Sequence, residues 1–142
     1  MTGNATILIV EDNDDLRGVL ETWIGGNFPL CTVVSARTGE EACARARAVR
    51  PTVVLMDIRL PRENGIETTR CIKACVPDAR IIILTMYEPS LYRDQAFDAG
   101  ASMYIMKDRI YNELPKAVAR CLPPGLEGGG SRRMYFQDGP PR

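Results

Sequence analysis

Several short apolar runs in this sequence end on side chains that are able to bind a metal ion or a phosphate. These side chains are Glu11 and Asp12, then Asp57, then Thr85, and finally Lys107. Carboxylate oxygens without histidine or cysteine suit a hard cation such as Mg²⁺, and three neighbouring carboxylates repel one another unless a cation lies among them. Asp57 would then be an oxygen nucleophile, while Thr85 and Lys107 would hold the oxygens of a transferred phosphoryl group. The pattern predicts phosphoryl transfer onto Asp57, provided that the fold brings these residues together.

Each of these residues has an ordinary interpretation when it is taken alone. An acid after a strand is commonly a solvated loop residue or a helix N-cap, and residues 12–15 include candidates for such a cap. Thr85 alone is compatible with a turn, and Lys107 alone with a surface charge. The functional interpretation therefore depends on one fold collecting these positions at one place.

Five apolar runs are expected to form strands. They cover residues 6–10, 31–35, 53–56, 81–84 and 103–106. The runs lack the strict alternation of apolar and polar residues that marks a half-exposed sheet. Both faces of the sheet should therefore be covered, as they are in parallel sheets.

Segments with a helical period separate the strands. Apolar residues recur at helical spacing over 16–24, and the glycine pair at 25–26 predicts the end of the first helix. A capping box of Thr38 and Glu41 opens the second helix, which is expected to end near Val49.

Three more helices are expected farther along the chain. The third begins near Ile66, and the fourth, over 89–98, carries few large apolar residues, so we expect it to pack weakly and to be able to move. The fifth carries apolar residues from Ile110 on one face and contains Pro115. If this helix starts near Ile110 or later, Pro115 lies in its first turns, where proline is tolerated, whereas a much earlier start would require a kink.

Alternating strands and helices give five βα units, which predict an α/β fold with a doubly wound, five-stranded parallel sheet. In such a sheet the C-terminal ends of the strands open on one edge, and ligands bind where the strand order reverses. The chain of 142 residues suits one domain, expected over 1–121, followed by a flexible tail rich in glycine and proline over 122–142.

Composition argues against several classes of function. Basic and acidic residues number 18 each. The chain therefore lacks the basic excess that would indicate binding to nucleic acid or to an anionic membrane surface. Neither a signal segment nor an apolar run of membrane-spanning length is found, and we expect a cytoplasmic location. The complete absence of histidine excludes Ser-His-Asp and Cys-His catalysis and a phosphohistidine on this chain.

The five cysteines include no C-x-x-C pair, which suits free thiols in a reducing compartment. Cys71 and Cys75 lie on one helical face. Because they lack histidine partners, we interpret them as packing residues and not as a zinc site.

The sequence resembles the receiver domain of two-component response regulators over about residues 5–121. The matching segments are ILIVEDN, VVLMDIRLPRENGIE, IIILTMYE and AGASMYIMK. The segment LPRENGIE, the TMYE, and an aspartate after Lys107 are most similar to the NarL/FixJ-type subgroup. The resemblance implies a flavodoxin-like (βα)5 fold with strand order 2-1-3-4-5.

The resemblance also implies a role for each site residue. Asp57 is the expected phosphoacceptor, and Glu11, Asp12, Asp57 and the backbone carbonyl of Arg59 are expected to place Mg²⁺. Thr85 and Lys107 are expected to contact the phosphoryl group, with Thr85 also acting in the switch. Tyr104 is the expected switch aromatic, which would otherwise be an ordinary half-buried strand residue. Arg59 and Tyr87 are expected to influence how readily water attacks the acyl phosphate.

The expected phosphodonor is a sensor histidine kinase. Phosphorylation is expected to change the surface around the fourth helix, fifth strand and fifth helix. A homodimer is one expected outcome of this change. DNA binding would require a C-terminal domain that this chain does not contain. Two other outcomes stay open, namely a stand-alone receiver that acts through protein contacts and an interaction module that does not depend on phosphorylation. A haloacid-dehalogenase-type hydrolase is disfavoured, because its second acid, two residues after the nucleophile, is replaced by Arg59.

Overall fold

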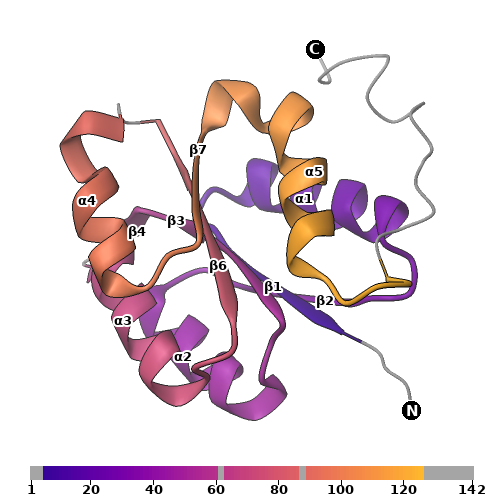
Figure 1. Cartoon of the computed structure of the whole chain (residues 1–142), viewed down its shortest axis with the longest axis horizontal. Coiled ribbons are helices and arrows are strands. Elements are labelled where there is room, and N and C mark those ends of the chain that lie inside the picture. Colours follow the sequence, from indigo (N-terminus) through magenta and orange to yellow (C-terminus); the bar gives the residue numbers. More distant parts are fainter. Residues whose placement is uncertain (1–4, 61–62, 87–88, 127–142) are drawn as a thin grey trace.

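A five-stranded parallel sheet forms the centre of the protein (Figure 1). The computed structural model describes residues 5–60, 63–86 and 89–126. The strands are β1 (Thr6–Val10), β2 (Thr32–Ala36), β3 (Val53–Asp57), β6 (Arg80–Thr85) and β7 (Met103–Met106). They lie in the order β2-β1-β3-β6-β7, which is 2-1-3-4-5 along the chain, and the predicted doubly wound fold is thereby confirmed.

The strand bounds differ from the prediction by one residue at several ends. The second strand starts and ends one residue later than expected, while β3 and β6 run on to include Asp57 and Thr85 as their last residues. A small antiparallel pair was not predicted: β4 (Arg59–Leu60) pairs with β5 (Glu63–Asn64) directly after the Asp57 strand.

Helices cover both faces of the sheet. They are α1 (Asp14–Asn27), α2 (Gly39–Val49), α3 (Gly65–Cys75), α4 (Pro89–Ala99) and α5 (Ile110–Cys121), with a short 3₁₀ turn, η1 (Lys107–Arg109), before the last. Figure 1 shows α1 and α5 on one face and α2, α3 and α4 on the other. The fifth helix begins at Ile110, which is the later of the two starts considered, so Pro115 falls in its second turn.

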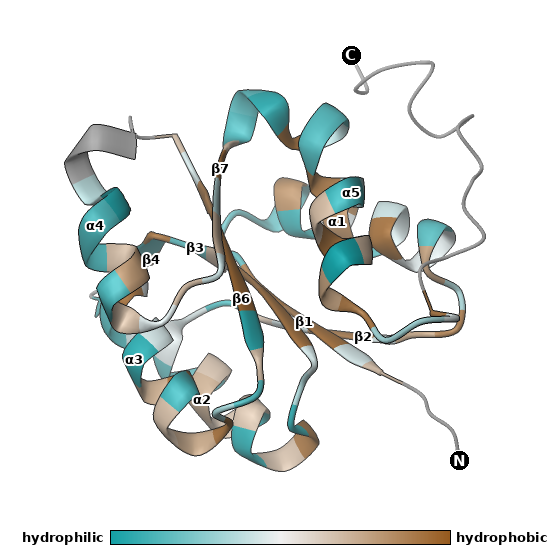
Figure 2. Cartoon of the chain, viewed as in Figure 1, coloured by the Kyte–Doolittle hydropathy of each residue, from teal (hydrophilic) through white to brown (hydrophobic). Residues whose placement is uncertain are grey.

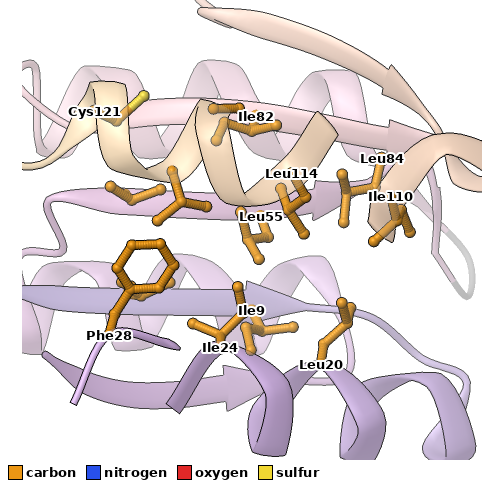
Figure 3. Packing of buried hydrophobic residues seen from close by; sticks show 14 of the residues in the cluster. Ile9, Leu20, Ile24, Phe28, Leu55, Ile82, Leu84, Ile110, Leu114 and Cys121 are labelled. Atoms are coloured by element: carbon orange, nitrogen blue, oxygen red, sulfur yellow. The ribbon is translucent and has the colours of Figure 1, made fainter. Parts of the chain in front are cut away.

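Alternate residues of the strands fill two apolar cores, one on each side of the sheet. In β3, Val53 and Leu55 face α1 and α5 and belong to the first core. Val54 and Met56 face the other three helices and belong to the second core. Figure 3 shows the first core, in which Leu55 lies close to Leu114 of α5. The strands are strongly apolar while polar residues gather on the helices (Figure 2). Burial on both faces explains why the strands show no simple alternation.

The first helix continues through Gly25 and Gly26 to Asn27, so the end predicted at the glycine pair is wrong. Phe28 is buried in the first core together with Ile24, and its backbone N–H donates to the Ile24 carbonyl at 2.9 Å. Burial of these apolar side chains offsets the conformational cost of glycine inside a helix.

The second helix begins as predicted. The Thr38 hydroxyl accepts a hydrogen bond from the Glu41 N–H at 3.1 Å, while the Glu41 carboxylate accepts from the Arg37 N–H, one residue earlier than in a standard capping box.

Among the described residues, no helix is long and apolar enough to cross a membrane.

Candidate functional site

An open cleft of about 720 Å³ lies at the C-terminal edge of the sheet. Its lining residues are Glu11, Asp12, Asn13, Asp57, Arg59, Leu60, Met86 and Lys107. They follow strands β1, β3, β6 and β7, and β1 and β3 are the neighbours at which the strand order reverses. This is the position at which doubly wound sheets bind ligands.

Three carboxylates converge in this cleft. Glu11, Asp12 and Asp57 each offer an oxygen, and these oxygens lie within 4.8 Å of one another. Glu11 is 2% exposed and Asp57 is 5% exposed, whereas Asp12 lies in solvent. The burial of Glu11 and Asp57 follows from the strands, because each of these two acids comes at the end of a strand that is buried on both faces.

Lys107 brings a positive charge to the two buried acids. Its Nζ atom lies 3.1 Å from Glu11 Oε1 and 3.4 Å from Asp57 Oδ2. The lysine begins η1, directly after β7, and this places its ammonium above the end of β3. One ammonium against three carboxylates leaves negative charge in excess.

Backbone amides complete the contacts of the acids. The Arg59 N–H donates to Asp57 Oδ1 at 3.1 Å, and the Asn13 N–H donates to Glu11 Oε2 at 3.2 Å. Asn13 is also the N-cap of α1, since its side chain accepts from the Leu16 N–H at 2.9 Å. Neither amide contact could be predicted from the sequence, because backbone donors do not depend on residue type.

The pKa of the Asp57 carboxyl is raised from its ordinary value of 3.8 to about 7. Burial is the largest cause of this raised pKa, and the charge of Glu11 adds to it. Lys107 and the Arg59 amide act in the opposite direction without cancelling these effects.

The residues of the cleft fit a divalent cation. The ligand set of Glu11, Asp12 and Asp57 is entirely carboxylate oxygen, and the open cleft leaves room for the water molecules that Mg²⁺ usually keeps. Glu11 Oε1 is buried and accepts no hydrogen bond within the described part of the chain; its contact is the ion pair with Lys107. A second positive charge would therefore reduce the repulsion that raises the Asp57 pKa.

Thr85 and Tyr104 are not among the residues that line the cleft. Thr85 ends β6 and is 1% exposed, while Tyr104 is half-buried on β7, opposite Ile83. Because partners in register and residues two apart share a face of a sheet, Thr85 and Tyr104 lie on the same face. Tyr104 packs against the second core and also lines a groove of about 400 Å³ between α4, β7 and α5.

The structure thus brings four of the predicted site residues into one cluster, namely Glu11, Asp12, Asp57 and Lys107. Arg59 lines the same cleft. Tyr87 lies outside the described residues.

Comparison with known proteins identifies the family. The sequence matches the model of the response regulator receiver domain over residues 7–119. The chain belongs to this family. The receiver is 35% identical over 126 residues to the transcriptional regulatory protein LnrK of Bacillus subtilis, a match that covers 84% of this chain and 57% of LnrK. It is 39% identical to the DNA-binding transcriptional activator DevR/DosR of Mycobacterium tuberculosis, covering 79% of this chain and 52% of the activator.

Solved structures agree with this assignment. A LuxR-family response regulator from Aurantimonas superposes with a TM-score of 0.76 at 36% identity, covering 83% of this chain and 84% of the other. The chemotaxis protein CheY4 of Vibrio cholerae gives a TM-score of 0.76 at 23% identity and covers 84% of this chain and 100% of CheY4, which supports the fold alone.

The match to a LuxR-family regulator confirms the predicted similarity to NarL/FixJ-type regulators. The receiver spans about half the length of the curated relatives that it matches.

Proposed function

We propose that this receiver accepts a phosphoryl group on Asp57 from a phosphohistidine of a sensor histidine kinase. The position of Asp57 carries this proposal: its buried carboxylate lies in an open cleft, between the acids of β1 and the ammonium of Lys107. The phosphohistidine has to lie outside the given sequence, because these 142 residues contain no histidine.

The proposed reaction uses the side chains of the cleft. Glu11, Asp12 and Asp57 would hold Mg²⁺ together with the Arg59 carbonyl. When bound, Mg²⁺ neutralises negative charge on the phosphoryl oxygens. An Asp57 oxygen attacks phosphorus, the phosphorus–nitrogen bond to the imidazole breaks, and an acyl phosphate forms on Asp57. Lys107 leaves its ion pair with Asp57 to bind a phosphoryl oxygen.

The acyl phosphate would act as a switch. The Thr85 hydroxyl moves to bond a phosphoryl oxygen, and Tyr104 turns into the space that Thr85 leaves. The shared sheet face of the two residues supports this coupling. The surface of α4, β7 and α5, where Tyr104 lines a groove, then changes its affinity for partners.

Slow hydrolysis of the acyl phosphate on Asp57 would end the signal. No external substrate would be turned over. A hydrolase of the aspartyl-phosphate type needs an acid two residues after its nucleophile, and Arg59 stands there. Arg59 lines the cleft and is proposed, with Tyr87, to set how readily water attacks the acyl phosphate.

The output would pass to a partner or an effector domain. The transcriptional regulators among the relatives support a role in the regulation of transcription. The proposed output acts in the cytoplasm, through a C-terminal DNA-binding domain outside this sequence, and phosphorylation favours a homodimer. A stand-alone receiver that acts through protein contacts is the alternative.

The test is phosphorylation of the full chain with acetyl phosphate, followed by intact mass measurement. With Mg²⁺ we expect a gain of one phosphoryl group that hydroxylamine removes, and with EDTA no gain. Asp57→Asn should abolish the gain, whereas Asp78→Asn, an exposed control after α3, should leave it unchanged.

Absence of the gain in the wild-type chain, or its persistence in Asp57→Asn, would contradict the proposal. The first result would favour an interaction module that does not depend on phosphorylation.

A further inference from the structure

Three thiols gather where α2 packs against α3. Cys43 comes from α2, and Cys71 and Cys75 lie four residues apart on α3. All three are free thiols of intermediate exposure, and Cys43 and Cys75 also pack against the second core. None of them lines the acidic cleft, so the proposed phosphorylation does not use them.

Cys71 has a positively charged neighbour. The Nη2 atom of Arg47 donates a hydrogen bond to Cys71 Sγ at 3.8 Å. The guanidinium is therefore placed to stabilise negative charge that develops on this sulfur when it reacts with an oxidant. The neighbouring Cys75 thiol, and then Cys71, raise the pKa of Arg47. The guanidinium is thus directed at the thiols of α3.

Cys43 is the thiol that can react with an oxidised Cys71. Cys43 lies one helical turn before Arg47 on α2, and Arg47 reaches across to Cys71. Burial and then the neighbouring Cys71 thiol raise the pKa of Cys43 to about 12. Cys71 and Cys75 are less suited to each other. Residues four apart on a helix have Cβ atoms about 5–6 Å apart, which is farther than the roughly 3.5–4.5 Å across a disulfide.

We propose that Cys71 and Cys43 form an oxidisable pair that closes a reversible disulfide between α2 and α3 when the receiver meets a hydroperoxide. The Cys71 thiolate attacks a peroxide oxygen, so that a sulfur–oxygen bond forms, the oxygen–oxygen bond breaks, and the leaving oxygen takes a proton from solvent. The Cys43 sulfur then attacks the sulfenic sulfur of Cys71, and the departing hydroxyl leaves as water with the Cys43 proton. Two thiols lose two electrons, and the peroxide is reduced to water or an alcohol.

The sequence makes the linkage simple to map. Trypsin cleaves after lysine and arginine, so Cys43 falls in peptide 38–45, Cys71 in 71–73 and Cys75 in 74–80. The reduced full chain is treated with an equimolar amount of hydrogen peroxide, alkylated, and digested without reduction. We expect a 38–45 peptide linked to 71–73 in monomeric protein, and its loss on treatment with dithiothreitol. No linked peptide, or 38–45 linked mainly to 74–80, would overturn the proposal even if every variant failed to fold.

Variants separate the roles of the residues. Cys43→Ser and Cys71→Ser should abolish the linked peptide, while Cys75→Ser, the matched control on the same face of α3, should retain it. Arg47→Gln should slow its formation by about threefold or more, because the positive charge beside Cys71 is lost. An unchanged rate in Arg47→Gln would overturn the assignment of Cys71 as the thiol that attacks the peroxide. Far-ultraviolet circular dichroism verifies the fold of each variant.

Discussion

Asp57 and Glu11 are buried side by side, and Lys107 contacts both. The pKa of Asp57 is about 7 because burial and the Glu11 charge outweigh the attraction of Lys107. In the protein without a metal ion, this arrangement disfavours the ionised form of Asp57. The ionised form is nevertheless the nucleophile. A bound cation would favour the ionised form, so nucleophile and metal binding are coupled at this one side chain.

In buffer with EDTA, Asp57→Asn should therefore stabilise the receiver, and more at pH 8 than at pH 5. The raised pKa means that the folded protein keeps a proton between about pH 4 and pH 7 that the unfolded chain has lost. The free energy of unfolding of the wild type thus falls as the pH rises through this window. We expect a gain of more than about 1 kcal/mol at pH 8, measured by urea unfolding. Equal gains at both pH values, or a loss, would contradict this electrostatic explanation.

The side chains of the cluster were accessible to sequence reasoning, and its backbone contacts were not. Glu11, Asp12, Asp57 and Lys107 follow apolar runs, and a parallel sheet places such ends on one edge. The backbone amides of Arg59 and Asn13 donate hydrogen bonds to the acids, and a backbone donor cannot be recognised from the residue type. The roles predicted for Thr85 and Tyr104 await experiment.

At the scale of elements, the sequence predicted the order of strands and helices and missed features that depend on packing. The first helix passes two glycines because Ile24 and Phe28 are buried beyond the reach of a local pattern. The β4–β5 pair is too short to show a periodicity, yet it holds the amide that bonds Asp57.

Gly25→Ala should stabilise the receiver. A Cβ atom added at Gly25 has no neighbour within 4 Å, and the residue lies inside α1. Alanine lowers the conformational entropy of the unfolded chain without a clash, so we expect the free energy of unfolding to rise by about 0.5–1 kcal/mol. Urea unfolding monitored by circular dichroism checks this. A lower stability would show that α1 needs a glycine at this position.

Gly65→Ala should have the opposite effect. A Cβ atom at Gly65, the first residue of α3, would collide with the backbone carbonyl of Asp57 and would lie 2.8 Å from the Ile58 Cα atom. Backbone atoms cannot move aside without displacing Asp57, so we expect a loss of about 1–3 kcal/mol, together with slower phosphorylation by acetyl phosphate. Wild-type stability in Gly65→Ala would contradict the close packing of α3 against the Asp57 loop.

At the scale of the molecule, one sheet supplies residues to both apolar cores, and neither core is complete without it. The family and the fold could be predicted because apolar runs and strand-end side chains recur in the expected order. The expected tail over 122–142 stays a prediction, since residues 127–142 lie outside the described part.

Because the cores share the sheet, the receiver should unfold in one cooperative step. The single tryptophan, Trp23, packs against Tyr111 with ring centroids 4.8 Å apart and reports on the first core. Its fluorescence and the far-ultraviolet circular dichroism should change at the same urea concentration. Two separate transitions would show that the two faces of the sheet unfold independently.

The central claim is that the Asp57 carboxylate itself receives the phosphoryl group, and borohydride trapping tests this most directly. Borohydride reduces an aspartyl phosphate to homoserine, and the tryptic peptide 48–59 contains no acidic residue except Asp57. After treatment with acetyl phosphate and Mg²⁺, we expect homoserine at position 57 in this peptide, and none when EDTA replaces Mg²⁺. An unmodified peptide 48–59, with homoserine at another aspartate such as Asp12, would contradict the account.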